Sequence, residues 1–308
     1  MDEPKPKASE SDRAEVRRRR GRMLYAILGA IGAVVRRLPL SAARAIGVSI
    51  GHLGWHVLRR ERRRAFKSLA IAFPDRSRRE HRRIARGMFH HLGKSVMEIL
   101  WLPNVNESNL NDTTTVTGIE PIAKLIREGH GVVVFTAHCG NWEWLAYGTG
   151  LTCPNVTVLQ RERNEADIGR LIVDTRSRAH VRTIDRGSVG AGREMIQALR
   201  HGGLMAFLID QSLQTESVKI PFFGLPAPTP IGPAKLAVRT ESYVASAFVH
   251  RERGHQYLAF SEPVATKRDD DPIAVTQRMT EAIEAQIRQY PEQWVWFHER
   301  WRERSRQG

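Results

Sequence analysis

A histidine, an asparagine and a glutamate follow directly on an apolar run in the stretch GVVVFTAHCGNWEWLAYG, residues 131–148. The run 132–135 has the composition of a fully buried strand, and His138 and Glu143 stand just beyond its end. Five positions correspond to about 140° on one continuous helix, so the two side chains do not share a helical face. They can meet if His138 lies on the turn before a helix and Glu143 reaches back from its first turn. A carboxylate bound to one ring nitrogen fixes the tautomer of an imidazole and leaves the other nitrogen free to accept a proton. Such a pair could activate a substrate hydroxyl without a protein nucleophile.

The surrounding sequence predicts an α/β fold with a mostly parallel central sheet covered by helices on both faces. Continuous apolar runs alternate with helical segments, which is typical of buried parallel strands. We expect strands near 132–135, 156–159, 181–184 and 204–210, and helices at 121–128, after Asn141, at 167–178 and at 193–199. Ligands bind at the carboxyl ends of strands in such sheets. His138 and Asp210 both stand at such ends.

The charge of the chain is concentrated at one end. Residues 1–100 hold 24 Lys or Arg and 9 Asp or Glu, whereas the remaining residues hold 24 of each. A local excess of this kind predicts contact with an anionic partner, either phospholipid headgroups or nucleic acid. Aromatic residues interleaved with the basic ones would favour nucleic acid, and they do not occur here, so we expect no nucleic-acid partner.

The N-terminal third is predicted to associate with a membrane. The apolar run 23–35 is shorter than the ~20 residues that a spanning helix needs, and a second apolar stretch, 45–58, ends in an arginine cluster. Apolar segments between arginine clusters are typical of an interfacial anchor, although a packed helical hairpin with solvated charges would give the same pattern. We therefore divide the chain into a disordered basic N-terminus (1–22), a helical membrane-associating region (23–110) and an α/β core (111–308).

Several motifs carry a resemblance to a known family. AHCGNWEW resembles the H-x4-E motif of the lauroyl/myristoyl acyltransferases of lipid A biosynthesis, which are related to phosphatidylinositol mannoside acyltransferases. Further motifs occur in the family's order and approximate spacing: an Arg–Phe-Pro segment at 62–83, RERN at 161–164, IDQS at 209–212, IPFFGLPAPT at 220–229 and PEQWVWFHERWRER at 291–304. The resemblance covers residues 25–304 and implies a glycerolipid acyltransferase-like core.

The resemblance also implies roles for individual residues. His138 would be the general base, oriented by Glu143, for attack of a membrane glycolipid hydroxyl on the thioester of an acyl carrier protein. Arg176 resembles the family's essential arginine, and Asp210 its later aspartate. RERN departs from the usual length and lacks a following proline, so Arg178 is the alternative bearer of the arginine's role. The implied substrate-binding residues are Asn141, Arg161, Asn164, Arg176, Asp210 and Gln211.

The segment 221–230 is predicted to be a rigid apolar loop beside the site, because it combines aromatic residues with Pro and Gly. Phe222 and Phe223 could wall an acyl pocket or belong to the core. Cys139 is best explained as a small packing residue. No cluster of His or Cys has the spacing of metal ligands, so no metal or redox cofactor is implied.

The implied activity is O-acyl transfer to a lipid A precursor on the cytoplasmic face of the inner membrane, in contact with anionic phospholipids. Two alternatives remain open at this point: an acyltransferase for phosphatidylinositol mannoside or another glycolipid, and a non-catalytic membrane-binding protein. Coenzyme A could also replace the acyl carrier protein as donor, although an acidic carrier would suit a basic rim.

Overall fold

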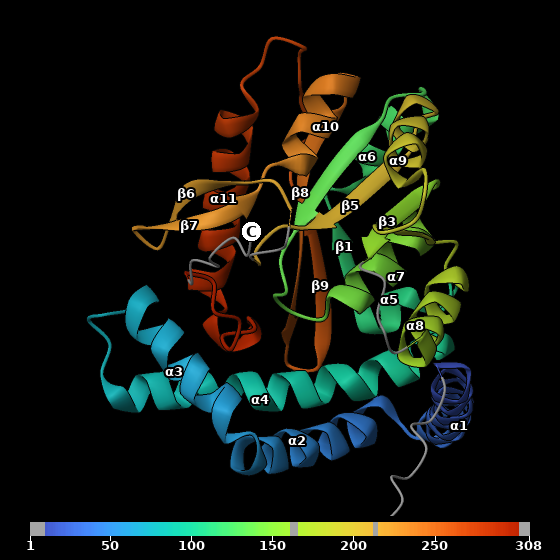
Figure 1. Ribbon diagram of the computed structural model, residues 1–308, viewed down its shortest axis with the longest axis vertical. Coiled ribbons are helices and arrows are strands. Elements are labelled where there is room, and N and C mark those ends of the chain that lie inside the picture. Colours follow the sequence, from blue (N-terminus) through green and yellow to red (C-terminus); the bar gives the residue numbers. More distant parts are fainter. Residues whose placement is uncertain (1–9, 161–165, 212–214, 302–308) are drawn as a thin grey trace, which may run out of the picture.

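The protein is built around one large sheet. The computed structural model describes residues 10–160, 166–211 and 215–301 (Figure 1). The strands of the main sheet are β1 (Thr114–Thr117), β2 (Val132–Thr136), β3 (Val156–Gln160), β4 (Arg182–Asp185), β5 (Leu204–Leu208), β8 (Tyr243–Glu252), β9 (His255–Phe260) and the short β10 (Val264–Ala265). Within the described residues their order is β1-β9-β8-β2-β5-β3-β4, with β10 paired to β8. All neighbours are parallel except β8 with β9 and β10 with β8. The predicted α/β class with a mostly parallel sheet is therefore confirmed.

Helices cover both faces of the sheet, as the continuous apolar strands require. On β2, Val133 and Phe135 join one hydrophobic cluster and Val132 and Val134 join the other, following the two-residue period of a strand. Helices α9 (Ala191–Arg200), α10 (Gly232–Thr240) and α11 (Pro272–Gln289) contribute to the first cluster. Helices α5 (Leu110–Thr113), α6 (Ile119–Arg127) and α7 (Trp142–Thr152) contribute to the second, and α8 (Ala166–Ser177) contacts α7.

The N-terminal third forms four helices, α1 (Glu10–Val35), α2 (Leu40–Val57), α3 (Arg59–Ala72) and α4 (Arg78–Trp101), with α2 and α4 running along one edge of the α/β core (Figure 1). A capping box begins α4, where Ser77 and Glu80 exchange hydrogen bonds. α2 packs closely on α4 through glycines: a Cβ on Gly93 would lie 2.0 Å from the carbonyl oxygen of Gly47.

The opposite side of α2 is exposed and apolar. Ile46, Ile50, Leu53 and Val57 follow one another at helical spacing and are 43–64% exposed. The helix thus combines the two arrangements that the sequence left open, a packed hairpin and an exposed apolar face. Among the described helices, none is long and apolar enough to cross a membrane.

Two segments differ from the sequence-based expectation. α1 begins at Glu10, within the segment 1–22 for which disorder is predicted, because the residues that follow are mostly good helix formers. The predicted loop 221–230 belongs to a hairpin of β6 (Ser217–Phe222) and β7 (Leu225–Pro230). Its prolines disfavour a strand assignment from sequence, but prolines are tolerated in a two-stranded hairpin where each strand has a free edge.

Candidate active site

The site begins where two neighbouring strands end. His138 follows β2 and Asp210 follows β5, and these two strands pair in parallel, with Phe135 opposite Phe207. Parallel neighbours bring their carboxyl ends to the same edge of a sheet, so the two side chains meet although 72 residues separate them. His138 Nδ1 lies 2.8 Å from Asp210 Oδ1. A carboxylate only accepts hydrogen bonds, so Nδ1 donates and Nε2 keeps its lone pair.

Both carboxylate oxygens of Asp210 accept hydrogen bonds. Its Oδ2 accepts a hydrogen bond from the backbone N–H of His138 at 2.9 Å and one from Trp294 Nε1 at 2.7 Å. Burial alone would raise the pKa of Asp210, but the charge of His138 and these hydrogen bonds outweigh it and lower the pKa to about 2. The carboxylate is therefore ionised at neutral pH, whereas the imidazole that it orients is 21% exposed and accessible to a substrate.

The predicted pair of His138 with Glu143 is wrong, because Glu143 binds a different partner. Its carboxylate forms a bidentate salt bridge with Arg176, in which Oε2 lies 2.8 Å from Nε and Oε1 lies 2.7 Å from Nη2. Both side chains are largely buried. Glu143 lies in the first turn of α7, as predicted, but points toward α8 and not back to the turn that carries His138. Arg178, the alternative bearer of the arginine's role, lines a separate groove between α1 and α8.

Asn141 supports the loop and is not available to a substrate. It is the N-cap of α7, where its Oδ1 accepts a hydrogen bond from the backbone N–H of Trp144. Its Nδ2 donates to Glu98 Oε2 at 2.9 Å, and the residue is buried. The structure therefore places Asn141 in the framework of the site, contrary to its predicted role in substrate binding. Gly140 has a φ of 69°, and a Cβ there would lie 2.0 Å from the carbonyl oxygen of Val249.

A buried ion cluster fixes Asn141 in turn. Glu98 on α4 is fully buried and accepts hydrogen bonds from Arg44 Nε at 2.6 Å and from Arg251 Nε at 2.7 Å, in addition to the one from Asn141. Burial alone would raise the pKa of Glu98, but the positive charges of Arg251 and Arg44, together with their hydrogen bonds, outweigh it and lower the pKa. Arg251 also contacts His91, and burial lowers the pKa of His91 to about 3. Sequence reasoning missed this cluster, because its members are scattered over helices and a strand far apart in the chain.

The C-terminal segment completes the site. Gly140 N–H donates to the carbonyl of Gln293 at 2.8 Å, and Val295 N–H donates to the carbonyl of His138 at 3.2 Å. Cys139 and Trp294 form an isolated antiparallel bridge there, so the C-terminal segment lies against the His138 loop. Cys139 is buried, which raises the pKa of its thiol and makes it a poor nucleophile at neutral pH.

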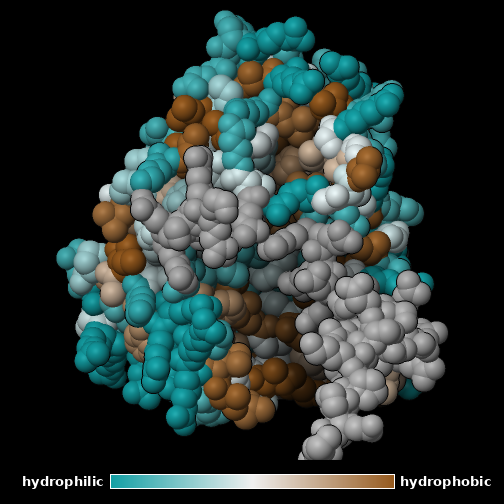
Figure 2. All heavy atoms as spheres, viewed as in Figure 1, coloured by the Kyte–Doolittle hydropathy of each residue, from teal (hydrophilic) through white to brown (hydrophobic). Residues whose placement is uncertain are grey.

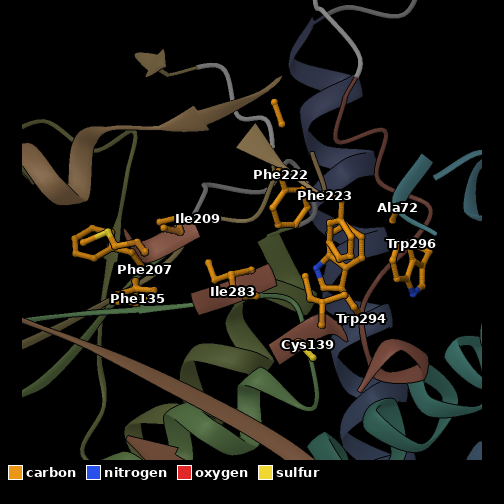
Figure 3. Close-up of a cluster of buried hydrophobic side chains, with 14 of the residues drawn as sticks. Ala72, Phe135, Cys139, Phe207, Ile209, Phe222, Phe223, Ile283, Trp294 and Trp296 are labelled. Atoms are coloured by element: carbon orange, nitrogen blue, oxygen red, sulfur yellow. The ribbon is translucent and has the colours of Figure 1, made fainter. Parts of the chain in front are cut away.

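Phe222 and Phe223 belong to the core and do not line an open pocket in the described structure. Both are buried, and their rings pack on each other and on Trp294 and Trp296 (Figure 3). Both rings also pack on Trp301. An apolar cavity of about 40 Å³ lies instead between α7 and the sheet. Its lining includes Leu145, Ala146, Val158, Leu159, Ala206 and Leu208, with Thr136, Trp142 and Arg176 as its more polar members. The ring of Trp142 lies 4.9 Å from that of His138, so the cavity adjoins the histidine.

The remaining predicted residues are less informative. Gln211 is partly buried next to Asp210. Arg161 and Asn164 lie outside the described residues.

Comparison with known proteins places this geometry in a family. A family described as bacterial lipid A biosynthesis acyltransferase matches residues 13–303. The chain is 26% identical to the lipid A biosynthesis lauroyltransferase of Escherichia coli over 88% of this chain and 89% of that protein. It is 24% identical to the palmitoleoyltransferase of the same organism over 87% of each chain. It is also 25% identical to the phosphatidylinositol mannoside acyltransferase of Mycobacterium tuberculosis over 68% of this chain and 67% of that protein. The chain therefore belongs to the bacterial lipid A biosynthesis acyltransferase family.

Proposed function

We propose that this protein transfers a fatty acyl chain from an acyl carrier protein thioester to a hydroxyl of a membrane glycolipid, most directly a lipid A precursor. The observation that carries the proposal is the partly exposed imidazole of His138, oriented by the buried carboxylate of Asp210 at the carboxyl edge of a parallel sheet. Among the described residues this arrangement supplies a base and no activated protein nucleophile beside it, which fits direct transfer between two substrates.

The proposed reaction uses the tautomer of His138 in which Nδ1 carries the proton and Nε2 is free to accept one. His138 Nε2 removes the proton of the acceptor hydroxyl while its oxygen bonds to the thioester carbonyl carbon, giving a tetrahedral oxyanion. The carbonyl then re-forms, the carbon–sulfur bond breaks, and the imidazolium returns its proton to the leaving thiolate. Asp210 stabilises the transient imidazolium and holds the ring in place, as the acid does in a Ser-His-Asp triad.

The cavity beside Trp142 suits the acyl chain of the donor. It adjoins His138, and most of its lining is aliphatic. At about 40 Å³ the cavity is smaller than the roughly 300–1,000 Å³ of a ligand site, so we propose that the chain enters from the Trp142 side by widening the cavity, and that the extent of this widening limits acyl length. The two-pronged ion pair with Glu143 keeps the guanidinium of Arg176 at the cavity wall without leaving a buried unpaired charge.

The exposed face of α2 suits a membrane that holds the acceptor. Figure 2 shows hydrophobic surface along the lower edge of the molecule beside a hydrophilic patch. The neighbouring helices α3 and α4 carry exposed arginines, including Arg59, Arg63, Arg79 and Arg82, in addition to the exposed aliphatic residues of α2. Apolar residues at acyl depth with arginines at phosphate level favour association with anionic phospholipids. We propose the cytoplasmic face of the inner membrane as the location, where the donor would be available.

The test combines lipid analysis with purified protein. Mass spectrometry of lipids from cells that lack this protein should reveal a lipid A species short by one acyl chain. In vitro, wild type should transfer a lauroyl group from acyl carrier protein to that species, and His138→Ala should not. Lauroyl-coenzyme A as a parallel donor decides between the two thioesters. An unchanged lipid A profile and retained transfer by His138→Ala would each contradict the proposal.

A second candidate is favoured by the mycobacterial relative, which acts, by its name, on phosphatidylinositol mannoside. In that case the same cells would show altered inositol glycolipids and a normal lipid A profile. A non-catalytic membrane protein would instead float with anionic liposomes and transfer no acyl group with either donor.

A further inference from the structure

The C-terminal segment places a second imidazole beside the proposed base. The ring centroids of His298 and His138 lie 5.9 Å apart, with the planes tilted by 46°. This separation is wider than a direct hydrogen bond between two imidazoles requires, and it leaves room for a substrate atom that touches both rings. His298 is partly exposed on the same side, so a substrate can reach it.

The position of His298 is fixed on both sides along the chain. Before it, Trp294 and Val295 are hydrogen-bonded to Asp210 and to the His138 loop. After it, Arg300 is buried and donates to Thr229 Oγ1 at 2.7 Å and to the carbonyl of Pro228. A residue between two such anchors has a defined place relative to the base, as a preorganised group in an active site must have.

Within the described part of the chain, neither ring nitrogen of His298 has a hydrogen-bond partner. Two nearby backbone donors are already used, because His138 N–H binds Asp210 and Gly140 N–H binds Gln293. A tetrahedral oxyanion formed next to His138 needs a donor directed at it. Among the described residues, His298 is one side chain near His138 that has a defined place and no committed hydrogen bond, so it can serve as that donor.

We propose that His298 donates a hydrogen bond to the carbonyl oxygen of the donor thioester and stabilises the oxyanion that develops there. This inference rests on the proposed acyl transfer and adds a catalytic residue to it. No proton is transferred by His298: its N–H stays on the ring while the electron pair of the carbonyl moves to oxygen and back.

The charge state of the ring is compatible with this role. Burial, with the positive charges of His138 and Arg64, lowers the pKa of His298 to about 4, and Asp210 opposes them only in part. His298 is therefore neutral at pH 7. A neutral imidazole can still donate a hydrogen bond, and it adds no cation that would oppose protonation of His138 during attack.

The experiment compares His298→Phe with His298→Gln in the full-length protein, using lauroyl-acyl carrier protein and the lipid A precursor. Removal of one oxyanion donor lowers kcat by about 10²–10³-fold, so we expect that loss in the Phe variant with KM changed less than threefold. The Gln variant keeps an N–H donor and should recover at least tenfold over Phe. His201→Phe, at an exposed histidine after α9, is the matched control and should behave as wild type.

A second donor separates this role from protonation of the leaving group. With an aryl thioester, whose thiolate leaves without a proton, the loss in His298→Phe should persist; its disappearance would overturn the oxyanion role. Equal loss in both variants, or a rise in KM at unchanged kcat, would also overturn it. If His138→Ala is inactive and His298→Phe is fully active, only this inference fails. If wild type transfers no acyl group, the proposed function fails and the inference fails with it.

Discussion

The substitution Asp210→Asn tests which acid orients the base. Oδ2 of Asp210 accepts two hydrogen bonds, from His138 N–H and from Trp294 Nε1, whereas Oδ1 faces His138 Nδ1. An asparagine will place its amide oxygen where the two donors converge, since its NH2 group cannot accept from either. The NH2 group then faces Nδ1, which must become the acceptor. The proton moves to Nε2, and the imidazole presents a donor to the substrate where the reaction needs a base.

The expected loss is large because both tautomer and charge are wrong. The equivalent change in a Ser-His-Asp triad lowers kcat about 10⁴-fold, and with no protein nucleophile to activate here we expect about 10³–10⁴-fold. At ~1.36 kcal/mol for each factor of ten, this is about 4–5.5 kcal/mol of transition-state stabilisation. The hydrogen bonds around residue 210 are conserved in number, so the folded protein should be retained. Transfer of lauroyl groups from acyl carrier protein, followed with the melting temperature, measures both.

Two comparisons decide the outcome. Glu143→Gln should cost less activity than Asp210→Asn, because Glu143 contacts Arg176 and leaves the tautomer of His138 unchanged. Asp269→Asn, an exposed aspartate remote from the site in sequence, should have no effect. More than a tenth of wild-type kcat in Asp210→Asn, or a greater loss in Glu143→Gln, would refute the assignment of Asp210 as the orienting acid.

Three further predictions concern the cavity, the ion cluster and pH. Ala146→Leu should fill the space of about two methylenes of a long acyl chain, at ~0.8 kcal/mol each, so transfer of a long chain should fall about tenfold and transfer of shorter chains should not. Equal rates at all chain lengths would show that the acyl chain binds elsewhere. Glu98→Gln leaves Arg44 and Arg251 buried without their carboxylate and should lower the free energy of unfolding in urea by about 3–5 kcal/mol, against less than ~1 for Glu128→Gln on the surface. Because the pKa of His298 falls from 6.5 to about 4 on folding, the unfolded chain binds the proton first, so stability is full above pH 6.5 and declines toward pH 4. Urea titrations across that range should show a shallower decline for His298→Gln, and an identical decline would contradict this.

The order of strands and helices was largely predictable, because the local patterns were strong. Continuous apolar runs predicted β2, β3 and β5. The β6–β7 hairpin was not predictable, since its four prolines are typical of a loop and its two strands pair only with each other. The hydrophobic periodicity of a segment indicates whether that segment is buried, but it does not indicate which other segments pack against it.

The sequence allowed the location of the site to be predicted, but not the contacts between its residues. Both His138 and Asp210 stand at strand ends in the sequence, and that coincidence was the feature that could have paired them. Choosing Asp210 over Glu143 required the knowledge that β2 and β5 are neighbours, which depends on the whole sheet order. His298 could be placed only through contacts of the C-terminal segment with the His138 loop.

The five-residue spacing between His138 and Glu143 has a physical meaning even without a contact between them. The turn after β2 is set by Gly140, so Glu143 falls in the first turn of α7, near the helix N-terminus, where a carboxylate is stabilised by the backbone dipoles. From there it binds Arg176 through two nitrogens, and the third nitrogen, Nη1, donates to Gln160 Oε1 at 3.0 Å. The guanidinium thus ties α7, α8 and β3 together at the wall of the apolar cavity. In the proposed reaction, a histidine and an acid at this spacing therefore serve by separate routes: the histidine would act on the hydroxyl, and the acid, through Arg176, would shape the wall of the cavity.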